Sequence, residues 1–256
     1  MQVIIDDLLT NYSLAGKSGE YILLIHGWGS SQQAFKGISK VLSASYRIVS
    51  LDLPGMGGSQ TPKDPWSLDD YRDFIVDFLD KINVKNIYSI IGHSNGGTIA
   101  IKLTSTNRLK VKKLILLGSA GIRDQGKPRK RAIQLAAKVG KSALRIAPKR
   151  LNRKLRNKLY KSIGSQALDN PLLEETFKKI VGEDVQESAQ KITIPTLIIY
   201  GKNDQDTPSE YGRLLQAKIK ESKLYIIDDA GHYVFIDKPK EVLNLINVFL
   251  NNKENH

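Results

Sequence analysis

Short apolar runs alternate with amphipathic stretches along most of the chain, a pattern typical of a parallel β-sheet covered by helices. Several runs are almost continuously apolar, which favours strands that are buried on both faces of a sheet. The runs are residues 21–25, 47–51, 86–91, 113–117, 195–200 and 223–227. Residues 3–16 predict a hairpin or edge strands ahead of them. The pattern therefore predicts an α/β fold with a mostly parallel, doubly wound sheet.

Amphipathic stretches predict helices at residues 68–82, 95–106 and 240–250. Ser67 is the expected N-cap of the first helix, because its hydroxyl can accept a hydrogen bond from a free backbone N–H of the first turn. Two aspartates follow in that turn, where the helix dipole favours negative charge. Helices between successive strands are what a doubly wound sheet requires.

The alternation of strands and helices breaks at residues 122–188, where the sequence predicts helices without strands. We therefore expect one core domain, residues 1–121 and 189–256, interrupted by a helical cap insert. An insert that follows a strand should lie over the carboxyl ends of the strands. Ligands of open α/β sheets bind at those ends, so the cap is expected to cover the functional site.

The formal net charge of +13 is concentrated in the predicted cap. Residues 123–161 hold fifteen Lys or Arg against the single acidic residue Asp124, so the rest of the chain is close to neutral. The favoured interpretation is a solvated outer face over an ordinary cap. The alternative is attraction of an anionic substrate or an anionic membrane surface. Nucleic-acid binding is not expected, because no nucleic-acid-binding motif accompanies the charge.

The chain contains no cysteine, which excludes disulfides, thiolate metal sites and thiol chemistry. Its first residues lack the basic segment and apolar run of a signal peptide. No stretch approaches the roughly 20 apolar residues of a membrane-spanning helix. A cytoplasmic location is therefore expected.

Gly92-His93-Ser94-Asn95-Gly96 places a serine between a predicted strand and a predicted helix. In a G-x-S-x-G of this kind the serine occupies a sharp, strained turn, so its hydroxyl projects above the sheet. Small residues are needed two positions before and after it, because strand and helix crowd together there. The alternative is an ordinary turn. The strand-to-helix context favours Ser94 as a nucleophile.

A serine hydroxyl needs a general base, and the chain holds four histidines. His232 follows the last predicted strand, so its loop should bring it to the same edge of the sheet as Ser94. His93 is expected to point into the sheet packing, and His26 to bond the backbone of its own loop. His256 is the C-terminal residue. His232 is therefore the candidate base.

The base needs a carboxylate on its second ring nitrogen, which fixes the tautomer and stabilises the imidazolium. Asp204 and Asp206 both follow the predicted strand at 195–200. The Gly-x-x-Asp spacing from Gly201 favours Asp204. Asp206 is then interpreted as a loop or helix-capping residue.

Hydrolysis of an ester also needs donors for the oxyanion that develops in the transition state. The backbone N–H of Asn95, at the start of a predicted helix, is one candidate. The N–H of Trp28 is the other, because Gly27 and Gly29 let its loop turn inward. These two groups form the predicted oxyanion hole.

These segments resemble the α/β-hydrolase superfamily, in its capped small-esterase and meta-cleavage-product-hydrolase branch. The matching segments are His26-Gly27-Trp28-Gly29, Asp52-Leu53-Pro54-Gly55-Met56-Gly57-Gly58-Ser59, Gly92-His93-Ser94-Asn95-Gly96-Gly97, Gly201-Lys202-Asn203-Asp204 and Gly231-His232. The resemblance covers nearly the whole core and implies a Ser-Asp-His triad in this chain order, with no metal and no organic cofactor. Serine replaces the aspartate nucleophile of haloalkane dehalogenases and epoxide hydrolases. Asn95 stands where related esterases often carry Met, Gln or Leu, which alters the pocket floor but not the backbone donor.

The combined features predict a carboxylic-ester hydrolase for small to medium acyl groups that works through an acyl-enzyme. The same triad would serve a lactonase, including one for acyl-homoserine lactones, or a hydrolase that cleaves a C–C bond of a vinylogous diketone. A third hypothesis is a non-catalytic protein that binds a ligand or an anionic surface. The residues expected to line the substrate pocket are His26, Trp28, Tyr160, Phe177 and Tyr233.

Overall fold

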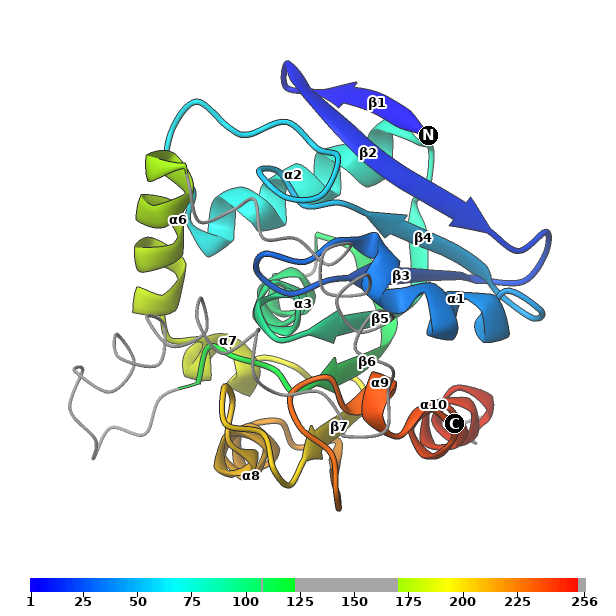
Figure 1. The fold of residues 1–256 in the computed structure, drawn as a ribbon. Helices are drawn as coiled ribbons and strands as arrows, with labels where there is room; N and C mark the ends of the chain where they lie inside the picture. The colour runs from blue at the N-terminus through cyan, green and yellow to red at the C-terminus, as the bar shows by residue number, and fades with distance from the viewer. Residues whose placement is uncertain (107, 123–169, 253–256) are drawn as a thin grey trace, which may run out of the picture.

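The computed structural model describes residues 1–106, 108–122 and 170–252 (Figure 1). Its centre is an eight-stranded sheet with the strand order β1-β2-β4-β3-β5-β6-β7-β8. The strands are β1 (Gln2–Ile5), β2 (Leu8–Ala15), β3 (Tyr21–Ile25), β4 (Arg47–Leu51), β5 (Asn86–His93), β6 (Lys110–Leu117), β7 (Thr196–Gly201) and β8 (Ser222–Ile227). The helical elements are η1 (Gln32–Phe35), α1 (Lys36–Leu42), α2 (Leu68–Lys81), α3 (Asn95–Ser105), α6 (Pro171–Gly182), α7 (Gln186–Gln190), α8 (Ser209–Lys218), α9 (Val234–Asp237) and α10 (Pro239–Asn251).

The sheet is parallel from β4 to β8 and antiparallel at its N-terminal edge. β3 pairs in parallel with β4 and β5, and the parallel pairing continues through β6 and β7 to β8. β1 and β2 form an antiparallel hairpin, and β2 pairs antiparallel with β4. The predicted hairpin and mostly parallel sheet are thus confirmed. The parallel pairs need crossover connections, which place helices on both faces of the sheet.

Alternate residues of β3 pack into two separate cores, one on each face of the sheet. Leu23 and Ile25 belong to the core that includes side chains of α2, α3 and α8. Ile22 and Leu24 belong to the core that includes side chains of α1, α9 and α10. Figure 1 shows α2, α3 and α8 on one side of the sheet and α1 and α10 on the other. Burial on both faces explains why the strand is a continuous apolar run.

The strands and helices predicted for the core are present in the described residues, with shifts at some ends. β6 starts at Lys110, earlier than predicted, because Lys110 already pairs with Asn86 of β5. Ser67 is the N-cap of α2 and forms a capping box with Asp70, as the sequence indicates. The short helices α1 and α8 were not predicted. Each contributes buried apolar side chains, such as Ile38 of α1, and this becomes visible only in the packed structure.

Helix α6 lies within the predicted insert, and α7 crosses its predicted end at residue 188. The backbone N–H of Trp66 donates to Thr176 Oγ1 of α6 at 3.0 Å. The N–H of Leu68 donates to Glu183 Oε1, just after α6, at 2.8 Å. These bonds attach α6 to the chain that leads into α2, at the first turn of that helix.

The proposed boundaries between core and cap stay a prediction, because residues 123–169 lie outside the described residues. The basic segment 123–161 falls within that range. Its interpretation as a solvated face, or as a surface for an anionic substrate or membrane, stays a prediction for the same reason.

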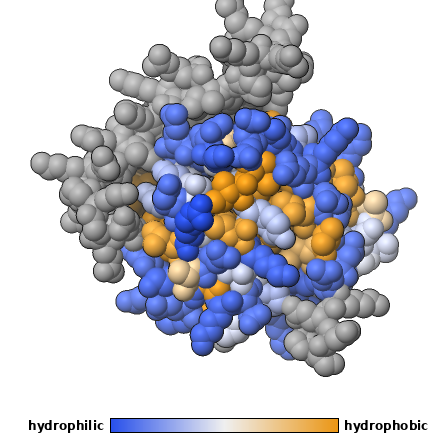
Figure 2. Space-filling model, turned by 90° about the horizontal axis from the view of Figure 1, so that it is seen from below, coloured by the Kyte–Doolittle hydropathy of each residue, from blue (hydrophilic) through white to orange (hydrophobic). Residues whose placement is uncertain are grey.

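The surface of the described residues mixes apolar and polar side chains. On the face seen from below the view of Figure 1, apolar patches lie between hydrophilic ones (Figure 2). Tyr225 of β8 and Val248 of α10 are among the exposed large apolar residues. None of the helices in the described part of the chain has the length and apolar character needed to cross a bilayer.

The start of α3 lies so close to the ends of β3 and β5 that glycine is required at both contacts. A Cβ on Gly96 would lie 2.1 Å from the carbonyl oxygen of Ile25 and 2.5 Å from that of His26. A Cβ on Gly92 would lie 2.5 Å from the carbonyl oxygen of Gly96. Backbone atoms cannot swing aside as the end of a flexible side chain can. The predicted need for small residues on either side of Ser94 therefore has a steric basis.

Gly96→Ala is expected to lower the free energy of unfolding by about 1–3 kcal/mol or more, because the new methyl group overpacks the contact with β3. Gly37→Ala is the matched control. Gly37 lies in α1, and a Cβ there would meet nothing within 4 Å. Alanine at this position should raise the free energy of unfolding by about 0.4–1 kcal/mol. Urea denaturation of both variants checks the pair, and equal midpoints would contradict the packing argument.

Candidate active site

Ser94 occupies the turn between β5 and α3 in a strained backbone conformation. Its φ of 52° and ψ of −120° lie in a region that side-chain-bearing residues rarely adopt. The carbonyl oxygen of Ser94 accepts hydrogen bonds from the N–H groups of Gly97 at 3.0 Å and Ala120 at 3.1 Å. Its own N–H donates to the carbonyl of Leu117 at 3.1 Å. These bonds hold the turn, and Ser94 is partly exposed while its neighbours in the chain are buried.

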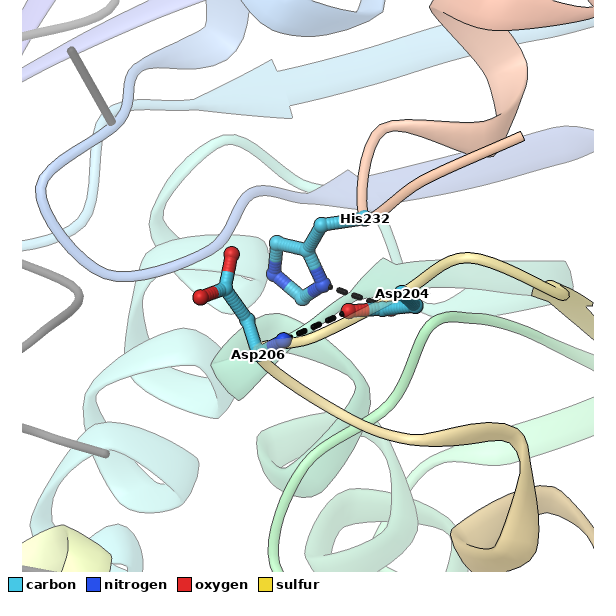
Figure 3. A group of neighbouring side chains, drawn as sticks. All are labelled: Asp204, Asp206 and His232. Atoms are coloured by element: carbon cyan, nitrogen blue, oxygen red, sulfur yellow. Dashed lines mark hydrogen bonds and ion pairs between the residues drawn. The ribbon is translucent and has the colours of Figure 1, made fainter. Parts of the chain in front are cut away.

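His232 and Asp204 form a hydrogen-bonded pair in the loops that follow β8 and β7 (Figure 3). His232 Nδ1 lies 2.8 Å from Asp204 Oδ2. The Asp204 side chain is fully buried, whereas that of His232 is 14% exposed. Asp204 Oδ1 accepts the backbone N–H groups of Asp206 and Thr207, both at 2.9 Å. These two bonds hold the Asp204 carboxylate in place independently of its contact with the imidazole.

The pair leaves the second ring nitrogen of His232 available to take a proton. With Nδ1–H directed at Asp204, Nε2 is the acceptor of the neutral ring. Burial alone would lower the pKa of His232. The negative charge of Asp204, its hydrogen bond and the charge of Asp206 together outweigh burial and raise the pKa above its usual value. An imidazole arranged in this way suits a general base.

His93 links the Ser94 turn to His232. The ring centroids of His93 and His232 lie 4.7 Å apart, and His93 Nε2 lies 3.1 Å from the carbonyl oxygen of His232. Burial and the neighbouring His232 hold the pKa of His93 well below its usual value, so His93 is neutral and donates from Nε2. Among the contacts of the described residues, no hydrogen bond joins Ser94 directly to His232. His93, the residue before Ser94 in the chain, contacts His232 and is buried in the packing as predicted.

Thr207 is part of the site, and the sequence analysis missed it. Its Oγ1 lies 2.8 Å from Asp204 Oδ2, 2.9 Å from the carbonyl oxygen of Gly118 and 3.1 Å from His232 Nδ1. The Thr207 hydroxyl therefore contacts Asp204, His232 and the carbonyl of Gly118, the residue just after β6. A threonine three residues after the candidate acid was the available signal, because such hydroxyls often bond a nearby Asp or backbone group.

His26 bonds the backbone of its own loop, as the sequence predicts, and its place among the pocket residues stays a prediction. The N–H of Leu53 donates to His26 Nε2 at 3.0 Å, and His26 Nδ1 lies 2.8 Å from the carbonyl oxygen of Gly27. The side chain is fully buried, and burial lowers its pKa. Both ring nitrogens are engaged with backbone, so neither is available to a substrate. The expected role, a histidine that bonds its own loop, fits this geometry.

The Asp52 carboxylate links the loop after β3, which carries His26 and Trp28, to the Asp-Leu-Pro-Gly segment after β4. It accepts hydrogen bonds from the N–H groups of Gln32 at 2.7 Å and Gly58 at 2.8 Å. A Cβ on Gly57 would lie 2.4 Å from this carboxylate, which explains the glycine. The motif therefore shapes the loop that carries Trp28, although its residues were not among the predicted site residues.

The loop that carries Trp28 runs alongside Ser94. A Cβ on Gly27 would lie 3.0 Å from the Cβ of Ser94. The backbone N–H groups of Trp28 and Asn95 have no acceptor among the described residues. Both are thus free to donate to an oxyanion, and their assignment to an oxyanion hole stays a proposal.

Two of the other predicted pocket residues are in contact. The rings of Trp28 and Phe177 of α6 lie 5.1 Å apart, centroid to centroid, and both side chains are partly exposed. Tyr233 packs instead on the histidines, 4.7 Å from the ring of His93 and 5.5 Å from that of His232. Tyr160 lies outside the described residues.

Asp204, Asp206 and His232 each offer an atom that lies within 4.8 Å of the others, a spacing that could hold a metal ion. The oxygens of Asp204 already accept two backbone N–H groups and face the imidazole and the Thr207 hydroxyl. A carboxylate has about four lone-pair positions, and these contacts use them. The donor set therefore fits a hydrogen-bonded pair better than a metal site.

Comparisons with known proteins extend this picture. A family model described as the α/β-hydrolase fold matches residues 20–239. The 2-hydroxy-6-oxo-6-(2'-aminophenyl)hexa-2,4-dienoic acid hydrolase of Metapseudomonas resinovorans is 25% identical, over 95% of this chain and 88% of that protein.

Solved structures share the fold over nearly the whole chain. The enol-lactonase of Burkholderia xenovorans aligns with a TM-score of 0.84 and 18% identity, covering 98% of this chain and 99% of the other. An esterase of Exiguobacterium antarcticum aligns with a TM-score of 0.81 and 22% identity, covering 96% and 97%. With the family match over most of its length, the chain belongs to the α/β-hydrolase fold family and is a hydrolase of that fold.

Proposed function

We propose that this hydrolase is a serine esterase, which cleaves carboxylic esters of small to medium acyl groups through an acyl-enzyme. Ser94 is the nucleophile and His232 the general base. Asp204 orients His232 and stabilises its protonated form. The observation that carries the proposal is the His232–Asp204 hydrogen bond at 2.8 Å. The His93 ring, 4.7 Å from that of His232, belongs to the residue before Ser94, and Ser94 itself is held at a φ of 52°. This combination supplies what a serine needs to act as a nucleophile at neutral pH.

The proposed reaction follows from which groups hold the proton. His232 Nε2 takes the proton of the Ser94 hydroxyl while the oxygen attacks the ester carbonyl. The N–H groups of Asn95 and Trp28 stabilise the oxyanion, and the protonated imidazole passes its proton to the departing alcohol. A water then attacks the acyl-enzyme, with His232 again as base, and releases the acid. The charge of Asp204 stabilises the imidazolium in both halves.

The substrate class is argued from the surroundings of Ser94. Trp28, on the loop beside Ser94, and Phe177 of α6 form a partly exposed pair that offers apolar surface for a modest acyl or alcohol group. Relatives and structural neighbours include an esterase, an enol-lactonase and a dienoic acid hydrolase, so lactones and vinylogous diketones are alternative substrates of the same triad. Comparing kcat/KM for p-nitrophenyl esters, lactones and a vinylogous diketone tests the preference for esters. A higher kcat/KM for either alternative would overturn it.

Ser94→Ala and His232→Ala are each expected to lower ester turnover by at least about 10³-fold while the fold is retained. Asp204→Asn should lose about as much, because the wrong tautomer of His232 then faces the serine. Steady-state turnover, circular dichroism and labelling by a fluorophosphonate probe check the three variants. The wild type should be labelled and Ser94→Ala should not. Full activity in any folded variant would refute the assigned roles.

Thr207→Val is expected to lower kcat about fivefold to tenfold, because it removes one hydroxyl that holds the Asp204–His232 pair. KM should stay close to the wild-type value, since the hydroxyl faces the pair and not the substrate. Thr207→Ser keeps the hydroxyl and serves as the matched control, with a kcat near that of the wild type. An unchanged kcat in Thr207→Val would show that the pair holds its geometry without this bond.

A further inference from the structure

The Asp206 side chain stands on the opposite side of the His232 imidazole from Asp204 (Figure 3). Its backbone N–H donates to Asp204 Oδ1 at 2.9 Å, which fixes where the side chain leaves the loop. One of its carboxylate oxygens lies within 4.8 Å of a ring nitrogen of His232. The carboxylate lies beside the edge of the ring that carries Nε2, the nitrogen that exchanges protons with the substrate in the proposed reaction.

The Asp206 carboxylate has no hydrogen-bond or ion-pair partner among the described residues. It does not cap α8, whose N-cap is Pro208 and receives no side-chain bond. Of the two predicted roles, helix cap is therefore wrong, and Asp206 is a loop residue between β7 and α8. A partly buried carboxylate without a structural partner is costly to keep, so its place beside the imidazole calls for another explanation.

Four ring or carboxylate groups that face His232 come from three places in the fold. Asp204 and Asp206 lie after β7, His93 ends β5, and Tyr233 follows His232 itself. Burial holds His93 in its neutral form, and Asp204 is hydrogen-bonded to the ring and to its own loop. Asp206 is the member of this set whose negative charge is not used in holding the site together.

We propose that Asp206 selects substrates by charge: its carboxylate favours esters with a neutral or cationic leaving group and disfavours those with an anionic one. This inference rests on the proposed function, because it concerns the same nucleophile and base. The leaving alcohol departs from the side of His232 Nε2, since that nitrogen delivers its proton. A charge on the alcohol therefore comes close to Asp206, where low effective dielectric makes the interaction strong.

The experiment uses three aryl acetates that differ in charge. They are 4-acetoxybenzoate (anionic), methyl 4-acetoxybenzoate (neutral) and 4-acetoxy-N,N,N-trimethylanilinium (cationic). The readout is the ratio of kcat/KM for each charged ester to that for the neutral one, at pH 8. Comparing this ratio between wild type and variant cancels the intrinsic reactivity of each ester.

Asp206→Asn is expected to raise the anionic-to-neutral ratio about tenfold and to lower the cationic-to-neutral ratio by a similar factor. Asp206→Glu should keep the wild-type preference. Asp228→Asn is the control for net charge, because Asp228 pairs with Lys202 on the surface and its side chain is 74% exposed. Its ratios should match those of the wild type. Rising salt should weaken the wild-type preference and leave Asp206→Asn unaffected.

A second readout separates a charge effect from a loss of structure. The charge of Asp206 raises the pKa of His232, so its removal should lower that pKa. The acidic limb of kcat/KM for the neutral ester should therefore move to lower pH in Asp206→Asn. A merely structural residue would reduce the rate without this shift.

The outcomes distinguish the two proposals. If wild type neither turns over the neutral ester nor reacts with a fluorophosphonate, the proposed function fails. If wild type is active and labelled but the charge ratios of Asp206→Asn equal those of wild type, the charge-selection proposal alone is overturned. A shifted ratio in Asp228→Asn would also overturn it, because net charge would then explain the effect.

Discussion

The hydrogen bond between His232 and Asp204 is the contact on which the proposed chemistry depends. An isolated imidazole has two interchangeable nitrogens, and a serine beside it would meet either one. Asp204 removes this ambiguity, because its buried carboxylate is held by two backbone N–H groups and braced by Thr207. The geometry is set by the loop after β7, before any substrate arrives. This is preorganisation, and it spares the reaction the cost of ordering the base.

The topology of the sheet explains why distant segments meet at this point. Strands β5, β6, β7 and β8 are adjacent and parallel, so the loops after them leave from the same edge. The loop after β6 packs against the Asp204–His232 pair, since a Cβ on Gly118 would lie 3.3 Å from Asp204 Oδ2. The same loop is held to β7, because the Tyr200 hydroxyl donates to the carbonyl of Ser119 at 2.5 Å. His93 and His232, separated widely in sequence, are in contact because the loops after β5 and β8 leave from the same edge of the sheet.

Local patterns were enough to predict the strands, the strand-to-helix turn at Ser94 and the preference for Asp204. The apolar pattern follows directly from burial. The glycines around Ser94 are required because α3 packs closely on β3 and β5 there. The roles of Thr207 and Asp206 were not accessible in the same way. Each depends on the direction in which a polar side chain points and on which backbone groups lie nearby, and tertiary packing alone decides both. The helices α1 and α8 escaped prediction because their short apolar faces are recognisable only against the sheet.

The central claim is that Ser94 carries the acyl group during turnover. The direct measurement is rapid acid quench of the protein with p-nitrophenyl acetate in its first turnover, followed by peptide mass spectrometry. The account predicts a burst of p-nitrophenol that approaches one per chain and an acetyl group on the peptide that contains Ser94. Turnover without any acyl intermediate, or an acetyl group found on another residue, would contradict it.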